Sequence, residues 1–169
     1  MRSYVNTVAR LALLSMLANT CAAQQHHPRM ETFKSPDGRL IAIVTSTNQP
    51  EATPESRVEI RTAEGKVLAH DTHLSDDGEH GYGVTKASWT PDSQYFVYSL
   101  ESSGGHQAWH SPVQYFSRNR SKILSLDDAL NDSVMDPQFT VAAPDKITVA
   151  LWFSKQTLTI SLSDVHPVR

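Results

Sequence analysis

The pattern of apolar and polar positions is clearest between residues 86 and 126, where it predicts four strands of one antiparallel sheet. Tyr95–Leu100 has five apolar or aromatic residues in six, which is typical of a strand covered on both faces. Val113–Ser117 and Lys122–Leu126 mix polar with apolar positions, as strands nearer a sheet edge do. With Ala87–Trp89 before them, these segments predict one buried strand and more exposed strands outside it.

A proline–aspartate turn joins the first two of these strands. In Thr90-Pro91-Asp92-Ser93 the proline presets φ at the second position of a type I turn, and the Thr and Asp side chains can bond local backbone amides. The same turn chemistry occurs at residues 35–38, ahead of the apolar segment Leu40–Val44. It occurs more faintly at Ala143-Pro144-Asp145, ahead of Ile147–Phe153.

These three turns recur at nearly equal spacing and define an internal repeat. Pro36 and Pro91 are 55 positions apart, and Pro91 and Pro144 are 53 apart. The first copy has a second predicted hairpin over residues 57–70, so its order of elements matches the central copy. The third copy ends with Thr157–Leu162, whose alternation predicts a half-buried strand. The repeats cover about 31–71, 84–126 and 138–163.

Two of the turns resemble a known family. The segments Ser35-Pro36-Asp37-Gly38-Arg39-Leu40-Ile41-Ala42 and Trp89-Thr90-Pro91-Asp92-Ser93-Gln94-Tyr95-Phe96-Val97-Tyr98 are similar to the repeats of TolB-type β-propellers, where such a turn joins the first two strands of a blade. The third turn matches loosely. The resemblance implies one blade-like sheet in each repeat. It also implies an exported bacterial protein that binds other proteins, or a propeller domain attached to a peptidase.

The number of repeats departs from this family. Propellers have about four to eight blades, whereas this chain supplies two full repeats and about half of a third, which cannot close a ring. We therefore expect an all-β fold of antiparallel sheets, either an incomplete propeller that forms an open stack or a β-sandwich-like arrangement. Apolar strands left open on the terminal sheets would favour a third outcome, ring closure by association of chains into a homo-oligomer.

The first 23 residues have the pattern of a signal peptide. Arg2 and Arg10 precede the apolar run Leu11–Ala18, which is too short for a membrane span of ~20 residues but suits the central region of a secretory signal. We expect cleavage after Ala22 or Ala23, which leaves a single β domain over residues 24–169 in the periplasm or outside the cell. The alternative is a lipoprotein anchored through Cys21.

Export changes the charge of the mature chain. Arg2 and Arg10 leave with the signal, so Lys plus Arg falls from 15 to 13 while all 18 acidic residues stay, and the formal charge moves from −3 to −5. This charge, without any basic cluster, argues against nucleic acid and anionic membrane surfaces as partners. The single cysteine lies in the signal, so no disulfide forms within the mature chain.

Strand order predicts one rim of loops that carries candidate chemistry. If each repeat runs up, down, up and down, the loops Ser102–Pro112 and Thr72–Gly83 lie at the same end. Trp109 is the expected contact residue, and two glycines permit close approach of a ligand. The alternative is a set of solvated loop histidines with Trp109 covering the sheet end. The candidate binding residues are Gly104, Gly105, His106, Trp109, His110, Asp76, Glu79 and His80.

Two functions remain open from these motifs. Neither a Gly-x-Ser-x-Gly elbow nor a phosphate loop occurs, which favours a non-catalytic binding module for a protein or peptide, without a cofactor. The alternative is a small metal-dependent hydrolase in which His106, His110 and Glu79 hold the metal, because imidazole and carboxylate are usual metal ligands. Their spacing on a loop does not by itself aim both histidine rings at one point.

Three further expectations concern residues outside this rim. Trp89 and Trp152 lie beside turn or strand signals and are expected in the core. The segment Ile147–Phe153 is expected to be one continuous apolar strand. Asp127, Asp128 and Asp132 are expected in a solvated turn with a short helical bend at Ala129-Leu130.

Overall fold

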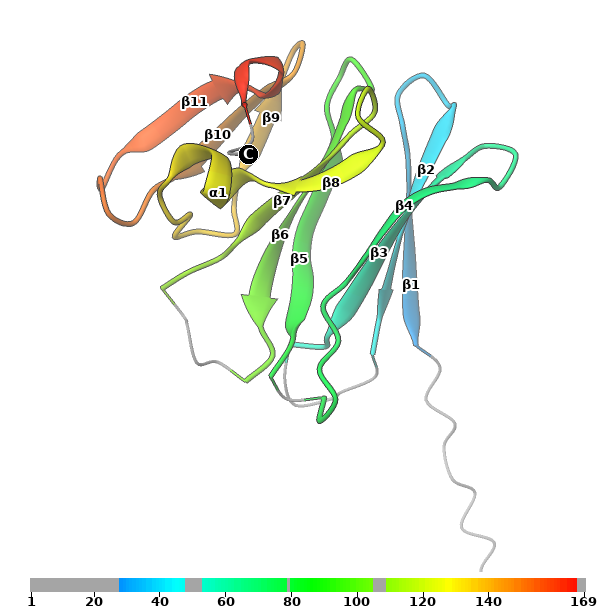
Figure 1. Cartoon of the computed structure of the whole chain (residues 1–169), viewed down its shortest axis with the longest axis horizontal. Helices are drawn as coiled ribbons and strands as arrows, with labels where there is room; N and C mark the ends of the chain where they lie inside the picture. Colours follow the sequence, from blue (N-terminus) through cyan, green and yellow to red (C-terminus); the bar gives the residue numbers. More distant parts are fainter. Residues whose placement is uncertain (1–27, 48–52, 79, 105–108, 167–169) are drawn as a thin grey trace, which may run out of the picture.

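The computed structural model describes residues 28–47, 53–78, 80–104 and 109–166 (Figure 1). Within these ranges, strands form three antiparallel sheets, and none of the three closes into a barrel. The predicted all-β fold class is therefore confirmed. The described part of the chain has no helix that is long and apolar enough to cross a membrane.

The first two sheets follow the two full repeats, and their strands pair in sequence order. The first sheet consists of β1 (Arg29–Lys34), β2 (Leu40–Ser46), β3 (Ser56–Thr62) and β4 (Val67–Thr72). The central sheet consists of β5 (Tyr82–Trp89), β6 (Tyr95–Ser102), β7 (Val113–Ser117) and β8 (Lys122–Ser125). The third sheet is smaller and has the order β11-β10-β9; it consists of β9 (Thr140–Ala142), β10 (Lys146–Ala150) and β11 (Thr157–Ser161). The helix α1 (Leu126–Leu130) precedes the third sheet, and the 3-10 helix η1 (Leu162–Asp164) follows it.

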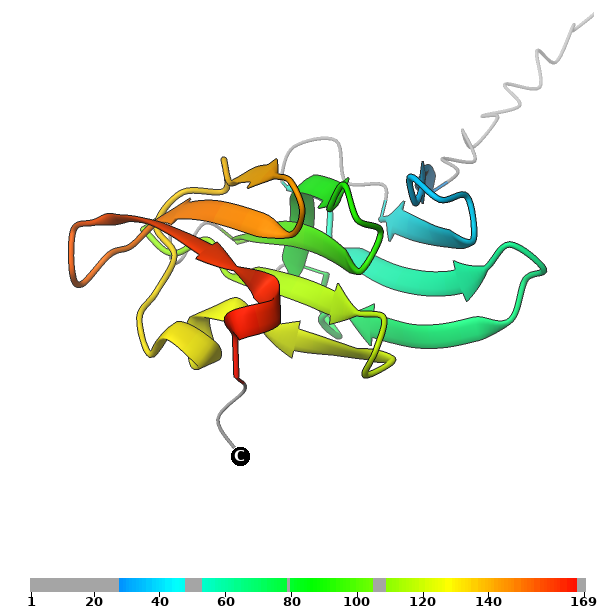
Figure 2. The same cartoon turned by 90° about the horizontal axis from the view of Figure 1, so that it is seen from above.

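The central sheet lies between the other two (Figures 1 and 2). All six side chains of Tyr95–Leu100 are buried, with at most 9% exposed, so the prediction of a strand covered on both faces is confirmed. Phe96, Tyr98 and Leu100 pack with the first sheet. Tyr95 and Val97 pack with the third sheet. Because burying one such side chain contributes roughly 1.5–3 kcal/mol, β6 is the main link between the two cores.

The repeat extends to individual hydrogen bonds in the first two turns. Thr90 donates its backbone N–H to the Tyr95 carbonyl at 2.9 Å, as Ser35 does to the Leu40 carbonyl at 2.9 Å. The hydroxyls of Thr90 and Ser35 each donate to the aspartate two residues later, at 2.6 and 2.7 Å. The third turn differs, because Asp145 accepts the backbone N–H of Ser163 at 2.9 Å instead.

The predicted strand Ile147–Phe153 is too long. β10 ends at Ala150, and Leu151 makes an isolated bridge with Val134. The chain then turns because Asp132 accepts the backbone N–H groups of Phe153 and Ser154, at 3.0 and 3.2 Å. Phe153 is 70% exposed, so the apolar run continues past the strand into a surface turn.

The outer faces of the two terminal sheets carry several polar side chains. On the third sheet, Thr148 pairs with Thr140 and Thr159 across three strands, and the hydroxyls of Thr148 and Thr159 lie 2.8 Å apart. On the first sheet, Arg61 forms an ion pair with Glu59 on the face opposite Val58 and Ile60. Polar outer faces are typical of terminal repeats, but the first sheet also presents Met30 and Val67 there, 67% and 46% exposed. Ring closure by association therefore stays a prediction.

Candidate functional site

The loops predicted to share one end of the sheets do meet there. Ser103, at the end of β6, donates its backbone N–H to the carbonyl of Gly81 at 2.9 Å. In Figure 1 the loop after β4 lies at the lower end of the central sheet, next to the start of β5. Strand order alone was therefore sufficient to predict which loops are neighbours.

Glu55 holds this end of the molecule together. Its side chain is 1% exposed, although it lies in a segment rich in polar residues. The carboxylate accepts the backbone N–H groups of Ser75 and Gly81, each at 2.7 Å, and the hydroxyl of Ser103 at 3.0 Å. It also accepts the Ser75 hydroxyl. One carboxylate thus joins three loops that are far apart in the sequence.

The environment of Glu55 favours its charged form. Burial by itself would raise the pKa of Glu55, but the hydrogen bonds from Ser75, Gly81 and Ser103 outweigh burial and hold the pKa below its ordinary value. Gly81 has to be a glycine here, because a Cβ atom would lie 2.2 Å from the His73 carbonyl oxygen and 2.5 Å from the Glu55 Cδ. Glu55 is therefore a structural hub with its acceptor positions filled.

The candidate binding residues from the sequence fall into different places. Gly105, His106 and Glu79 lie outside the described residues. Gly104, Asp76 and His80 are exposed, and His80 contacts Asp77 in its own loop through Nδ1. Trp109 and His110 make contacts with other elements.

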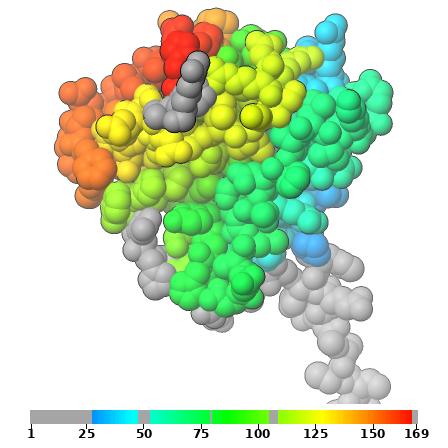
Figure 3. Space-filling view, viewed as in Figure 1, coloured from blue at the N-terminus to red at the C-terminus, as the bar shows by residue number. Residues whose placement is uncertain are grey.

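Trp109 and His110 belong to a cluster of aromatic side chains at the surface. The Trp109 ring stacks on His110, with ring centroids 5.4 Å apart, and lies 5.3 Å from the ring of Trp152. Trp109 is 40% exposed and Phe153 is 70% exposed. The turn between β10 and β11 that carries Trp152 and Phe153 (orange) projects at the edge of the molecule in Figure 3. We call Trp109, Trp152 and Phe153 the aromatic patch.

Asp127 orients His110 beneath this patch. Its Oδ1 lies 3.0 Å from His110 Nε2, and the carboxylate also accepts the backbone N–H groups of Val113 at 2.9 Å and Val134 at 2.8 Å. The Asp127 side chain is only 13% exposed. The expectation of a solvated Asp127 was therefore wrong, because the first turn of α1 directs this carboxylate toward the start of β7.

An open groove runs beside the aromatic patch and is acidic. The pKa of Asp132 lies below its ordinary value, because hydrogen bonds from the backbone of Phe153, Ser154 and Ser133 outweigh the opposing effect of burial. The groove can hold a ligand that carries positive charge. Its lining consists of His110, Asp127, Asp128, Asn131, Asp132, Ser133 and Phe153.

The expectation that Trp152 lies in the core was wrong. Its side chain is half-buried, and Lys155 Nζ lies 3.4 Å from the centroid of its ring. Trp89 is buried as expected, and its indole N–H donates to the Phe33 carbonyl at 3.0 Å. The two tryptophans differ because Trp89 ends a central strand, whereas Trp152 follows the last residue of β10 by two positions.

The proposed metal ligands are only partly within the described residues. Of His106, His110 and Glu79, only His110 is described, and its ring nitrogen contacts Asp127. Among residues 28–47, 53–78, 80–104 and 109–166, no group of three or more His, Cys, Asp or Glu side chains could hold a metal ion. His110 contacts Asp127 and Trp109, and no local sequence pattern predicted its contact with Asp127.

Comparison with protein-family models gives no match for this chain, and comparison with curated proteins gives none either. The resemblance to TolB-type repeats therefore stays a prediction from the residues. The function has to be argued from the geometry of the site.

Proposed function

We propose that this chain is an exported, non-catalytic β-repeat module that binds a protein or peptide through the aromatic patch and the adjacent acidic groove. The observation that carries the proposal is the exposed Trp109, whose ring contacts the rings of His110 and Trp152. Tryptophan is enriched at the energetic centre of protein interfaces. A partly exposed aromatic pair of this kind is suited to contact with a partner as well as to packing within the chain.

The chemistry of the groove supports a partner with a basic residue next to an apolar one. Asp128 and Asp132 contribute negative charge at the groove, and Phe153 contributes an apolar wall. Lys155 already lies over the ring of Trp152, so this ring face accepts a cation within the chain itself. A peptide that presents an apolar side chain to Trp109 and a Lys or Arg to the groove would use both features.

The setting of this module is proposed from the sequence. The apolar run Leu11–Ala18 supports export to the periplasm or beyond, and the blade-like repeats support a relation to incomplete propellers of the TolB type. The lack of a Gly-x-Ser-x-Gly elbow and of a phosphate loop in the sequence supports a non-catalytic module.

A displayed peptide library tests the proposal directly. We expect the mature protein to enrich peptides that carry an apolar or aromatic residue beside Lys or Arg. Trp109→Ala should weaken binding of an enriched peptide by about tenfold or more, because a central tryptophan contributes ~2 kcal/mol or more at interfaces. Met30→Ser is the matched control, since Met30 is 67% exposed on the first sheet, away from the patch.

Two results would contradict the proposal. One is enrichment of peptides whose binding is equal in the Trp109→Ala and Met30→Ser variants. The other is stoichiometric metal in the purified protein together with a melting temperature that falls on chelation, which would favour the metal-dependent hydrolase instead.

A further inference from the structure

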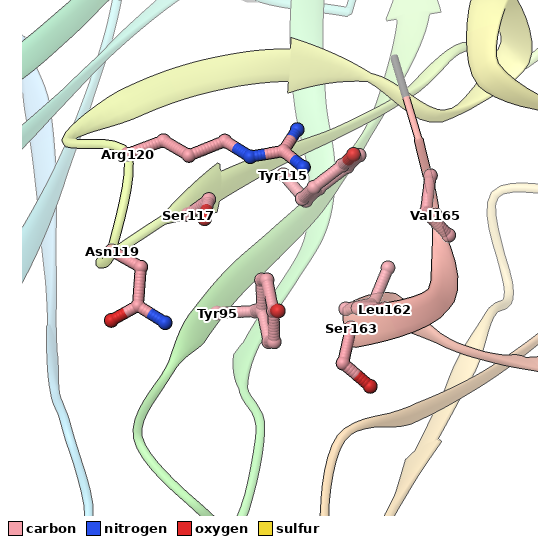
Figure 4. Close-up of a pocket in the computed structure, with 8 residues that line it drawn as sticks. All are labelled: Tyr95, Tyr115, Ser117, Asn119, Arg120, Leu162, Ser163 and Val165. Carbon is pink, nitrogen blue, oxygen red and sulfur yellow. The ribbon is translucent and has the colours of Figure 1, made fainter.

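We propose that a second site, in a hollow between the central sheet and η1, binds a single carboxylate group through Tyr115 and Arg120. This site is separate from the aromatic patch and does not depend on it. Its lining comes from the start of β6, from β7 and the β7–β8 turn, and from η1 with the residue after it (Figure 4). The volume of the hollow is about 190 Å³, which is enough for a small organic group.

The hollow is formed by the way in which η1 covers the central sheet. Tyr95 and Tyr115 lie on the same face of that sheet, with ring centroids 6.1 Å apart. Leu162 and Val165, 2% and 4% exposed, come from the end of the chain and form the opposite wall. Arg120, in the β7–β8 turn, closes the hollow from the side in Figure 4.

Tyr115 provides the first indication of a ligand. The side chain is 1% exposed, yet its hydroxyl has no hydrogen-bond partner among the described residues. A buried hydroxyl without a partner destabilises the fold, so native proteins seldom leave one in place. The buried Tyr98 of the same sheet shows the usual solution, because its hydroxyl donates to Asp71 at 2.8 Å.

Arg120 provides the second indication. Its side chain is exposed and makes no ion pair or side-chain hydrogen bond within the described ranges. The positive charge lies close enough to Tyr115 to oppose the effect of burial, which raises the pKa of that hydroxyl. Asn119 and Ser163 add further polar groups to the lining. Arg120 is the one charged residue among the described residues of the lining, and a planar guanidinium is suited to a carboxylate.

A nearby acidic residue favours a ligand with one negative charge. Asp145 Oδ2 accepts the backbone N–H of Ser163, a lining residue, at 2.9 Å. This carboxylate repels a dianion such as phosphate more strongly than a monoanion. The favoured ligand is a monocarboxylate, either a small organic acid or the C-terminal carboxylate of a peptide.

Nuclear magnetic resonance of the mature full-length chain distinguishes these sources. We would titrate acetate, lactate, inorganic phosphate and acetyl-trialanine with either a free or an amidated C-terminus. Backbone amide shifts at residues 117–120 and 162–165 are expected with a free carboxylate, with a Kd at or below about 1 mM. Arg120→Gln should weaken binding about tenfold and Tyr115→Phe about fivefold. Each variant removes from the protein one group that hydrogen-bonds the ligand.

Matched controls separate this site from the rest of the molecule. Arg57→Gln removes an exposed arginine of the first sheet, and Tyr98→Phe removes a buried hydroxyl of the other core. Both should leave the carboxylate affinity unchanged, as should Trp109→Ala.

Each outcome decides the proposal. Binding by the peptide acid alone identifies a C-terminal carboxylate, and equal binding by acetate or lactate identifies a small organic acid. Tighter binding of phosphate than of any carboxylate would overturn the assignment, and so would absence of shifts at about 10 mM of every probe. Shifts that persist unchanged in both Arg120→Gln and Tyr115→Phe would also overturn it.

Discussion

The two interfaces of the central sheet differ in how they treat their buried polar groups. At the interface with the first sheet, the Tyr98 hydroxyl donates to Asp71 at 2.8 Å, and the Trp89 indole N–H donates to the Phe33 carbonyl at 3.0 Å. At the interface with the third sheet, the Tyr115 hydroxyl has no partner among the described residues and faces a hollow. His73 Nε2, near the first interface, makes no hydrogen bond either, but it lies 3.2 Å from Asp71 Oδ2 in an ion-pair contact. The Tyr115 hydroxyl has no such contact within the described residues, so it is the group that calls for an explanation.

The difference arises from how completely each neighbour covers the central sheet. The first sheet has four strands, and its two inner strands, β2 and β3, pair with each other over seven residues. The third sheet has three strands, and β9 is only three residues long. On this side η1 completes the cover, because Leu162 packs in the same core as Tyr115 and lines the hollow.

We expect the largest effect from removal of the Glu55 carboxylate, which joins the loops at one end of the interface between the first and central sheets. Glu55→Ala should lower the free energy of unfolding by about 3 kcal/mol, because it leaves the backbone N–H groups of Ser75 and Gly81 and the Ser103 hydroxyl without their acceptor. Urea denaturation measures this change. Glu31→Ala is the control, since Glu31 is an exposed β1 residue and should change stability by less than ~0.5 kcal/mol.

The same carboxylate predicts a pH dependence with a definite sign. Because the pKa of Glu55 is lower in the folded protein, its contribution is complete above the unfolded pKa and is lost as the pH falls through the folded pKa. The stability difference between the wild-type protein and Glu55→Gln should therefore shrink below about pH 4.3. A difference that grew on acidification would mean that Glu55 is protonated in the fold.

The parts of this architecture that sequence could predict are those that rest on local periodicity. Five apolar residues in Tyr95–Leu100 were enough to predict a strand buried on both faces, and recurring Pro-Asp turns were enough to predict successive sheets. Strand order then predicted which loops are neighbours. Each of these inferences needs only residues that are close together in the chain.

The parts that could not be predicted depend on contacts across the repeats. Glu55 receives hydrogen bonds from residues 20 to 48 positions away, and no local pattern distinguishes it from the other acidic residues of polar loops. Asp127 likewise meets His110 from 17 positions away. Trp152 was expected in the core because an apolar run does not reveal where its strand ends.

A smaller effect separates the two buried tyrosines. Tyr98→Phe should lower the free energy of unfolding by about 1.5 kcal/mol, because Asp71 loses a hydrogen bond in a buried setting. Tyr115→Phe should change it by less than ~0.5 kcal/mol or raise it, since its hydroxyl makes no hydrogen bond within the described part of the chain. Thermal and urea unfolding of both variants, without added carboxylates, test the contrast. Equal losses would remove the distinction between the two interfaces.

The smallest expected effect concerns the ion pair between Arg118 and Asp37, at the opposite end of the interface between the first and central sheets. Arg118 Nη1 lies 2.7 Å from Asp37 Oδ2, and this ion pair, with the hydrogen bond from Ser35, holds the pKa of Asp37 below its ordinary range. The side chains of Arg118 and Asp37 are 24% and 31% exposed, so solvent screens most of the attraction. Arg118→Gln should therefore cost about 0.5 kcal/mol.

Salt and pH reveal the electrostatic origin of this small effect. The difference between wild type and Arg118→Gln should decrease at about 1 M salt and below about pH 3.9, where unfolded aspartate becomes protonated. Arg120→Gln is the matched control, because Arg120 has no ion pair in the described ranges and should lose no stability. If Arg118→Gln lowered the free energy of unfolding more than Glu55→Ala does, the interface between the first and central sheets would be held mainly at the turns. Glu55 would then be a minor contact among the loops.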